Sequence, residues 1–372
     1  MPHYNNGNRN SKNNKYDDSY NYNRHSEFED ISSSSKHNKK KRKSGKIVAN
    51  VFITILSILL AIGGSLMIYT YNVLDSMNFE NIDDTSNDTS TKGLLNDSLV
   101  LNVLMFGSDS RSDSPEDGRS DSILMVSIDN RHKKLKLTSF LRDTFVEIPG
   151  YGYNKLNAAY AFGGPKLAVE TIERNFGVDI DRYIVIDFQN FVSIVDVLGG
   201  VDVELTDDEA ATINRILRVE HKSDKAEPIY GGGVHHLNGA QALAHSRNRD
   251  SALSDFDRTS RQRDVVFAIV NEFKTASLPQ LTSIVSEVGP MITTNFKKSE
   301  ITSLLSNSLT YLNYPVSQRG APERSECYDD YSDEGQSILK VTDWTDLRNE
   351  IATYIYEESF KGSSKSSSVS ED

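Results

Sequence analysis

Cysteine is scarce in this sequence. Cys327 is the single one among 372 residues, so no intramolecular disulfide bond can form. A folded part outside the membrane would have to be stabilised without disulfides, and the cysteine count does not by itself identify the compartment. Zinc-site spacing is also lacking, because His235, His236 and His245 do not form a recognisable ligand pattern.

An excess of positive charge is missing too. Lysine and arginine number 41 against 53 aspartates and glutamates, which gives a net charge of -12. Nucleic-acid binding depends on a basic surface, so this balance argues against it, and no helix-turn-helix pattern is evident. Basic residues can therefore act only as local anion sites.

Charge is absent altogether from residues 47–74, whose apolar centre covers residues 51–68. A hydrocarbon core of about 30 Å needs roughly 20 helical residues, so this segment predicts one transmembrane helix. The basic run KKKRK at residues 39–43 stands just before it, and the positive-inside rule then places the N-terminus in the cytoplasm and the remainder outside. A cleaved signal peptide would be shorter and nearer the N-terminus. We expect a single-pass protein of the cell membrane with an extracellular folded domain.

Composition divides the rest of the chain. Residues 1–46 are rich in Asn, Ser, Tyr and Lys without apolar periodicity, which predicts a disordered cytoplasmic tail. Residues 75–97 are polar and read as a stalk, residues 98–360 as the folded domain, and the serine-rich residues 361–372 as a second disordered tail.

Strand-like and helix-like segments alternate in the folded domain. Nearly continuous apolar runs bounded by Gly, Asp and Ser are typical of central strands that are covered on both faces. The pattern predicts an α/β domain with a central mixed β-sheet flanked by helices, preceded by the transmembrane helix. Residues 207–233 are expected to form a surface excursion and residues 317–337 a long polar loop. Expected strands are residues 99–106, 123–128, 135–140, 183–188 and 201–205; expected helices are residues 165–176, 191–198, 278–288, 301–312 and 343–356.

Arginine is concentrated between residues 247 and 263, where five occur in seventeen positions. A helix starting near Asp257 would place Arg258, Arg261 and Gln262 on the face that should be buried. Arginine is rarely buried unpaired, so either neighbouring carboxylates or an anionic ligand must meet these side chains. Asp255 stands at the expected N-cap, where free N–H groups also favour an anion. An internal Arg/Asp network that only fixes packing is the alternative.

Two carboxylates fall at neighbouring strand ends. Asp109 follows the first expected strand in G-S-D-S-R, and Asp121 opens the second in R-S-D-S after Arg119. Mg²⁺ is usually held by one or two carboxylates, water and phosphate oxygens, so such a pair suffices. Asp and Ser are also ordinary turn residues, which is the alternative. Further on, Arg142 and Asp143 follow the third expected strand.

In combination these motifs resemble the LytR-CpsA-Psr family, membrane-anchored enzymes of Gram-positive envelopes that move glycan phosphates from polyprenyl carriers to peptidoglycan. The likeness is densest over residues 98–274, and the chain departs from the family at Leu141, where a proline is usual. The motifs are R-x-R at Arg247 and Arg249, D-x-x-R-x-x-R-Q at residues 255–262, G-x-D-x-R at residues 107–111, R-S-D at residues 119–121 and K-x-N-x-A-Y at residues 155–160.

The resemblance implies transfer of a glycan 1-phosphate from a polyprenyl pyrophosphate to a peptidoglycan hydroxyl, with release of polyprenyl phosphate. It implies that Asp109 and Asp121 hold Mg²⁺, or Mn²⁺ in its place, and that the substrate is bound by Arg119, Lys155, Arg261 and Gln262. The catalytic residues it implies are Arg142, Arg247, Arg249, Asp255 and Arg258. Either Asp255 or Asp143 would accept the acceptor's proton. Candidate walls of a lipid cavity are Phe162, Ile172, Phe188, Phe191, Ile194 and Val195.

Other functions remain open at this level. A pocket that admits water would make the protein a polyprenyl-pyrophosphate phosphatase, and a pocket that only binds would make it a non-catalytic envelope regulator or a lipid or glycan binder. Teichoic acids, capsules and other wall polysaccharides would all present the same pyrophosphate. The sequence therefore does not select the polymer.

Overall fold

The computed structural model describes residues 96–108, 120–220, 226–248, 254–275 and 286–358, with short pieces at Ser57, residues 74–75 and 78–79, and Leu94. The chain divides into Met1–Ala61 and Ile62–Asp372, and every element described below belongs to the second unit. The expected tails, and the expected anchor apart from Ser57 and Leu74, lie outside the described residues. Among the described residues, no helix is long and apolar enough to span a membrane.

A seven-stranded mixed sheet forms the centre of this unit. Strand β3 runs antiparallel to both β2 and β4, while β7 pairs parallel to β2 and β11 parallel to β4. The predicted α/β class with a mixed sheet is thus confirmed. In sheet order the strands are β1 (Asn78–Phe79), β10 (Thr293–Thr294), β7 (Arg182–Asp187), β2 (Val100–Ser108), β3 (Ser120–Asp129), β4 (Lys134–Phe140) and β11 (Val316–Ala321).

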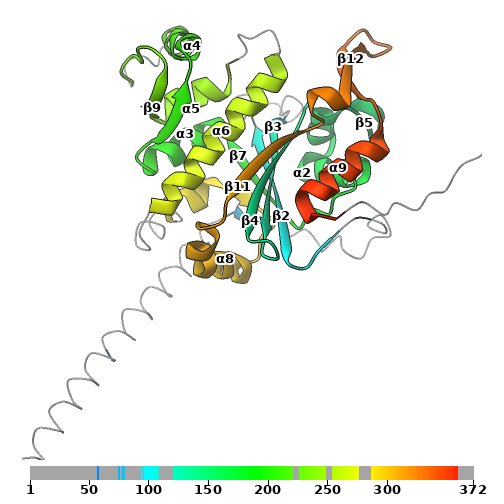
Figure 1. The fold of residues 1–372 in the computed structure, drawn as a ribbon, viewed down its shortest axis with the longest axis horizontal. Helices are drawn as coiled ribbons and strands as arrows, with labels where there is room; N and C mark the ends of the chain where they lie inside the picture. Colours follow the sequence, from blue (N-terminus) through cyan, green and yellow to red (C-terminus); the bar gives the residue numbers. More distant parts are fainter. Residues whose placement is uncertain are drawn as a thin grey trace, which may run out of the picture. The chain divides into compact units, whose positions relative to one another are not determined.

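Helices cover both faces of the sheet, which is why its central strands are apolar on both sides. On one face α2 (Leu156–Phe176) and α9 (Trp344–Tyr356) pack on Leu104, Phe106 and Met125. On the other lies α6 (Ser254–Thr275), with α5 (Gly239–Ser246) and α3 (Phe188–Val197) behind it (Figure 1). Two further helices are α4 (Asp207–Val219) and α8 (Lys298–Tyr311).

Three two-stranded ribbons extend from this core. They are β5 (Phe145–Ile148) with β6 (Gly152–Lys155), β8 (Val201–Leu205) with β9 (Gly233–Leu237), and β12 (Cys327–Tyr331) with β13 (Ser337–Val341). Short 3-10 helices occur at η5 (Gly289–Met291) and η6 (Arg324–Glu326). The β5–β6 and β12–β13 ribbons adjoin, because Thr144 and Leu339 form a bridge.

Two expected loops are regular structure, and those predictions were wrong. The excursion at residues 207–233 begins with α4, which starts in a capping box of Thr206 and Glu209 and buries Ala210, Ile213 and Leu217. The polar loop at residues 317–337 contains most of β11 and all of β12. Backbone pairing with β4, rather than an apolar alternation, holds the polar strand β11 in the sheet.

Candidate active site

A cavity of about 510 Å³ lies between the sheet and the helices of the α6 side. Its walls are mainly apolar, and arginines, a glutamate, a glutamine and serines line the remainder. Phe188 and Phe191 line it as expected, whereas Phe162, Ile172, Ile194 and Val195 are not among its lining residues. The lining residues are Met105, Phe106, Gly107, Ser122, Leu124, Ile186, Phe188, Phe191, Arg215, Ile216, Val219, Glu220, Leu243, Ser246, Arg247, Arg258, Gln262 and Val266.

Helix α6 brings Arg258 and Gln262 to this cavity. The helix begins at Ser254, so Asp255 lies within its first turn instead of at the expected N-cap. Arg258 is only 2% exposed, and its Nη2 lies 2.7 Å from Oδ1 of Asp255. A guanidinium this deeply buried beside an apolar cavity is suited to an anionic group of a ligand.

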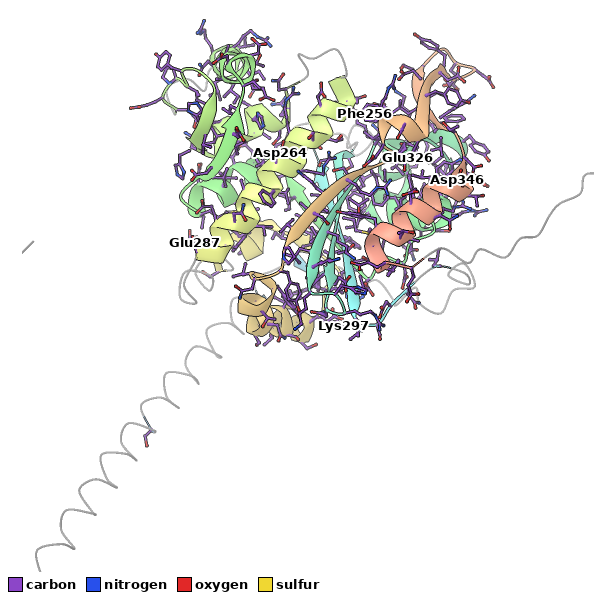
Figure 2. The ribbon with its side chains drawn as sticks, viewed as in Figure 1. Phe256, Asp264, Glu287, Lys297, Glu326 and Asp346 are labelled. Carbon is purple, nitrogen blue, oxygen red and sulfur yellow. The ribbon has the colours of Figure 1, made fainter. Side chains whose placement is uncertain are left out.

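Phe256 packs the start of α6 against residues of the β4–β5 turn and the β12–β13 ribbon. Its ring packs on a small cluster formed by Leu141, Cys327 and Leu339, and the guanidinium of Arg324 lies 5.4 Å from the ring centroid. Figure 2 shows Phe256 on α6 at the end of the helix that is nearest the β12–β13 ribbon. This packing fixes the position of the neighbouring Asp255.

The residues predicted at Arg142, Lys155, Asp255 and Arg258 converge in one network. Lys155 Nζ, at the end of β6, lies 2.8 Å from Asp143 Oδ1. Arg142 Nε lies 3.3 Å from Asp143 Oδ2, and its Nη2 lies 3.7 Å from Asp255 Oδ1. The turn between β4 and β5 supplies Arg142 and Asp143, so three separate parts of the chain meet here.

Asp143 and Asp255 share a hydrogen bond within this network, and their pKa values move in opposite directions. Burial alone would raise the pKa of Asp143, but hydrogen bonds from Asp255 and Lys155 outweigh it and lower that pKa to about 2. Burial raises the pKa of Asp255, and the hydrogen bond to Asp143 adds to the rise. Asp143 is therefore the ionised partner and Asp255 the more basic one.

Arg247 lines the cavity from the C-cap of α5. Its Nη1 lies 2.6 Å from Oε1 of Glu220, and its guanidinium lies 5.3 Å from the ring centroid of Phe188. Glu220 follows α4 and also lines the cavity. No sequence motif marks this carboxylate, which stands among other charged residues.

Arg261 was expected to bind the substrate, but it does not lie at the cavity. It is 9% exposed, but it is not among the lining residues of the cavity. Its Nε lies 2.7 Å from Oε1 of Glu209, and its Nη1 donates to the carbonyl oxygen of Asn248 at 3.0 Å. Asn248 stands between Arg247 and Arg249 in the chain, so Arg261 holds the segment that carries them.

The expected metal ligands lie at the edge of the described structure. Asp109, Arg119 and Arg249 are outside the described residues, and so is the side chain of Asp121. Their strands are described: Gly107 pairs with Ser122, both line the cavity, and the register shifts at Ser108. The backbone thus places Asp121 beside a cavity-lining residue, and β2 ends at the same place.

A second group of possible ligands occurs at the opposite end of β3. The ligand atoms of Asp129, His132 and Glu357 lie within 4.8 Å of one another. The ammonium of Lys136 is 2.8 Å from Asp129 and 3.2 Å from Glu357, so these carboxylates already have a cationic partner. This group is therefore a structural ion cluster of the β3–β4 turn.

Comparisons with known proteins agree with this architecture. The LytR_cpsA_psr family model matches residues 65–343. Polyisoprenyl-teichoic acid--peptidoglycan teichoic acid transferase TagV of Bacillus subtilis is 30% identical over 272 residues, which are 70% of this chain and 66% of that relative. The TagU transferase of Bacillus cereus is 31% identical over 264 residues, 68% of this chain and 80% of that relative.

A solved structure described as TagT bound to LI-WTA has the same fold. Its TM-score is 0.57 at 26% sequence identity, and the match covers 72% of this chain and 95% of that one. The family model, the two relatives and the shared fold therefore indicate the same family.

Proposed function

We propose, from the premise that the chain belongs to the LytR-CpsA-Psr family, that it transfers a glycan 1-phosphate from a polyprenyl-pyrophosphate carrier to a hydroxyl of peptidoglycan. The relatives TagV and TagU are named for transfer of teichoic acid to peptidoglycan. The observation that carries the proposal is the cavity. Its walls are mainly apolar, and they include the buried Arg258, the half-buried Arg247 and the amide of Gln262.

The apolar part of the cavity suits a prenyl chain. Binding cavities for small ligands usually measure about 300–1,000 Å³ and are lined by apolar and aromatic side chains with a few placed polar groups. Here Leu124, Phe188 and Val266 are among the apolar walls. Arg247, Arg258 and Gln262 then bind the pyrophosphate, because guanidinium groups match phosphate oxygens in a fork geometry.

The proposed reaction is an in-line displacement at phosphorus. A peptidoglycan hydroxyl oxygen forms a bond to the phosphorus that carries the glycan, the bond from that phosphorus to the bridging oxygen breaks, and polyprenyl phosphate leaves. Phosphoryl transfer depends mainly on positioning and charge stabilisation. Arg142, Arg247, Arg249 and Arg258 stabilise the charge on the phosphate oxygens, and Lys155 keeps Asp143 ionised.

Asp255 is the proton acceptor in this scheme. Of the two candidate carboxylates it has the raised pKa, and a stronger base accepts a proton more readily. Asp143, with a pKa of about 2, stays ionised. The hydroxyl proton therefore passes to the ionised Asp255 as the oxygen attacks, and the carboxyl group that forms donates a hydrogen bond to the Asp143 carboxylate.

Asp109 and Asp121 would hold Mg²⁺, or Mn²⁺, beside the pyrophosphate. Support comes from the strands: β2 ends and β3 begins side by side at the cavity, with Gly107 and Ser122 in its lining. Two carboxylates at such a position are a sufficient protein contribution for a hard divalent cation. A bound ion would neutralise charge on the leaving phosphate.

We also propose that residues 47–74 anchor the protein in the cell membrane, with the N-terminus in the cytoplasm and the folded domain outside. Support comes from the uncharged segment and the basic run before it. Reporter fusions at the two ends test this topology. A cytoplasmic reporter that is active only at the C-terminal end would contradict it.

The test of activity uses the full chain in detergent or nanodiscs. It is incubated with a synthetic polyprenyl-pyrophosphate glycan, Mg²⁺ and a peptidoglycan oligomer, and mass spectrometry detects a phosphodiester-linked product. Arg258→Lys and Asp255→Asn should abolish the product, whereas Arg131→Lys, at an exposed arginine paired with Asp97, should not. Free glycan phosphate without product would indicate a phosphatase, and lipid binding without turnover would indicate a binding protein.

A further inference from the structure

The β5–β6 hairpin extends directly from the catalytic network. Arg142 and Asp143 lie three and two residues before the start of β5, and Lys155, which contacts Asp143 at 2.8 Å, is the last residue of β6. Asp143 in turn shares a hydrogen bond with Asp255. A molecule bound along this hairpin therefore lies close to the network that contains the proposed proton acceptor, Asp255.

One face of the hairpin is buried and the other is open. Val146 and Ile148 are buried in the main core. Since side chains alternate along a strand, Phe145 and Glu147 point to the opposite face. The register pairs Phe145 with Lys155 and Glu147 with Tyr153, which places all four side chains on that outer face.

Large aromatic rings dominate the open face and its end. Tyr153 is 66% exposed and stacks on Phe145, with ring centroids 5.6 Å apart and planes at 28°. Tyr151, in the hairpin turn, is 58% exposed and stacks on Phe162 of α2, 42% exposed, at 4.7 Å and 19°. We call these two stacked pairs, one on the open face and one between the hairpin turn and α2, the aromatic platform.

The platform is held in place by the backbone. Gly150 and Gly152 adopt positive φ values of 80° and 77°, which flank Tyr151 in a tight turn. The Tyr151 hydroxyl donates to the carbonyl oxygen of Phe162 at 3.4 Å, which links the turn to α2. Exposed aromatic rings in a fixed, stacked arrangement usually mark a binding surface.

We infer that the aromatic platform is the subsite for the glycan strand of the acceptor, whose sugar rings stack on Tyr153 and Tyr151 and so bring a hydroxyl to Asp255. This inference rests on the proposed function and assigns its acceptor side. A sugar ring has apolar faces and a polar rim. Tyrosine faces match the former, and the tyrosine hydroxyl and Glu147 can hydrogen-bond the latter.

The charges of the hairpin do not suit an anionic membrane. Glu147 lies on the same face, where it pairs with Arg174 at 3.5 Å, and Lys155 is engaged by Asp143. Attraction to anionic lipids needs an unneutralised basic cluster, which the described residues of this hairpin do not supply. A neutral, hydroxyl-rich glycan is the better match.

The experiment uses the full chain in nanodiscs and a synthetic tetrasaccharide of alternating N-acetylglucosamine and N-acetylmuramic acid. Tyr151→Ala and Tyr153→Ala are compared with Tyr328→Ala and Tyr331→Ala, which remove exposed tyrosines from the β12–β13 ribbon. We expect each platform variant to raise the KM for the acceptor about tenfold, the factor that a lost stacking contact supplies. The KM for the lipid donor and the kcat at saturating acceptor should stay unchanged, and Tyr153→Trp should restore the acceptor KM.

Binding is measured separately, by titrating the tetrasaccharide without donor and following tyrosine resonances or fluorescence. Loss of binding in the platform variants but not in the control variants supports the subsite even if wild-type protein transfers nothing, in which case only the proposed function fails. Equal acceptor KM values in platform and control variants overturn the inference. It is also overturned if the platform variants lose binding to vesicles of anionic phospholipid while tetrasaccharide binding is unchanged.

Discussion

Arg261 Nη1 donates to the carbonyl oxygen of Asn248 at 3.0 Å while its Nε lies 2.7 Å from Glu209 on α4. Asn248 immediately follows Arg247, which lines the cavity. Arg261 thus connects α4 and α6 to the backbone of the R-x-R segment without itself lining the cavity. It acts as a positioning residue.

Replacing Arg261 should therefore disturb both stability and activity. Arg261→Ala leaves the half-buried Glu209 without its guanidinium, and loss of such charged hydrogen bonds costs about 1.5–3 kcal/mol of unfolding free energy. Arg261→Lys keeps the charge but loses the fork that reaches two acceptors, so it should fold and still transfer poorly. Urea unfolding and the transfer assay measure the two effects. Wild-type rates in Arg261→Lys would show that the R-x-R segment needs no such support.

The helix face containing Arg258, Arg261 and Gln262 was correctly expected to be buried. The sequence did not predict that these side chains would face two different surroundings. At about 100° per residue, Arg261 points roughly 60° to one side of Arg258 and Gln262 roughly 40° to the other. That separation is enough for Arg261 to face Glu209 while the other two face the cavity. Sequence periodicity gives the direction of a side chain but not the element that meets it.

The strands of the sheet likewise differ in how well the sequence predicts them. Strands β2 and β3 could be predicted because burial on both faces makes their central residues nearly continuously apolar. Strand β11 reads VSQRGA, and its place in the sheet depends on backbone pairing with β4. No local sequence pattern predicts such a pairing. The convergence of Arg142, Lys155 and Asp255 was expected from the family motifs, whereas Glu209 and Glu220 could be found only in three dimensions.

Two half-buried carboxyl groups should make the free energy of unfolding fall as pH rises. Burial raises the pKa of Glu173 to about 7, from 4.5, and that of Asp181 to about 6, from 3.8. The folded state therefore binds these protons more tightly than the unfolded chain does. Their contribution is fully present below pH 3.8 and is lost progressively as pH rises to about 7.

Glu173→Gln isolates this effect. His245 acts in the opposite sense, since burial lowers its pKa to about 4 and protonation of the unfolded chain costs stability as pH falls below 6.5. The difference in urea midpoint between wild type and Glu173→Gln cancels that term. We expect the variant to gain on the wild type between pH 5 and pH 7, with Glu334→Gln, at an exposed position, as control. A difference that does not change with pH would contradict the assignment.

Glu220 competes with phosphate for Arg247. The carboxylate lies 2.6 Å from the guanidinium in the cavity lining, so a pyrophosphate must displace it or share the arginine. Glu220→Gln should tighten binding of a polyprenyl pyrophosphate roughly two- to fivefold, the range expected for a partly exposed ion pair. Isothermal titration at low and high salt measures the effect, with exposed Glu204→Gln as control. Weaker binding in Glu220→Gln would mean that this carboxylate orients Arg247 for the ligand.

Chain-length selectivity should depend on the apolar part of the cavity. Val266 on α6 lines it together with Leu124 and Leu243, and Val266→Trp would fill part of the 510 Å³. A longer prenyl chain buries more apolar area and so loses more when the space is filled. We expect affinity for a polyprenyl pyrophosphate to fall at least about tenfold, while a short prenyl pyrophosphate loses much less because Arg247 and Arg258 still hold its phosphates. Val234→Trp, at an exposed position that does not line the cavity, is the matched control. Equal losses for both chain lengths would mean that Val266→Trp disturbs the arginines, and that the lipid tail occupies another part of the protein.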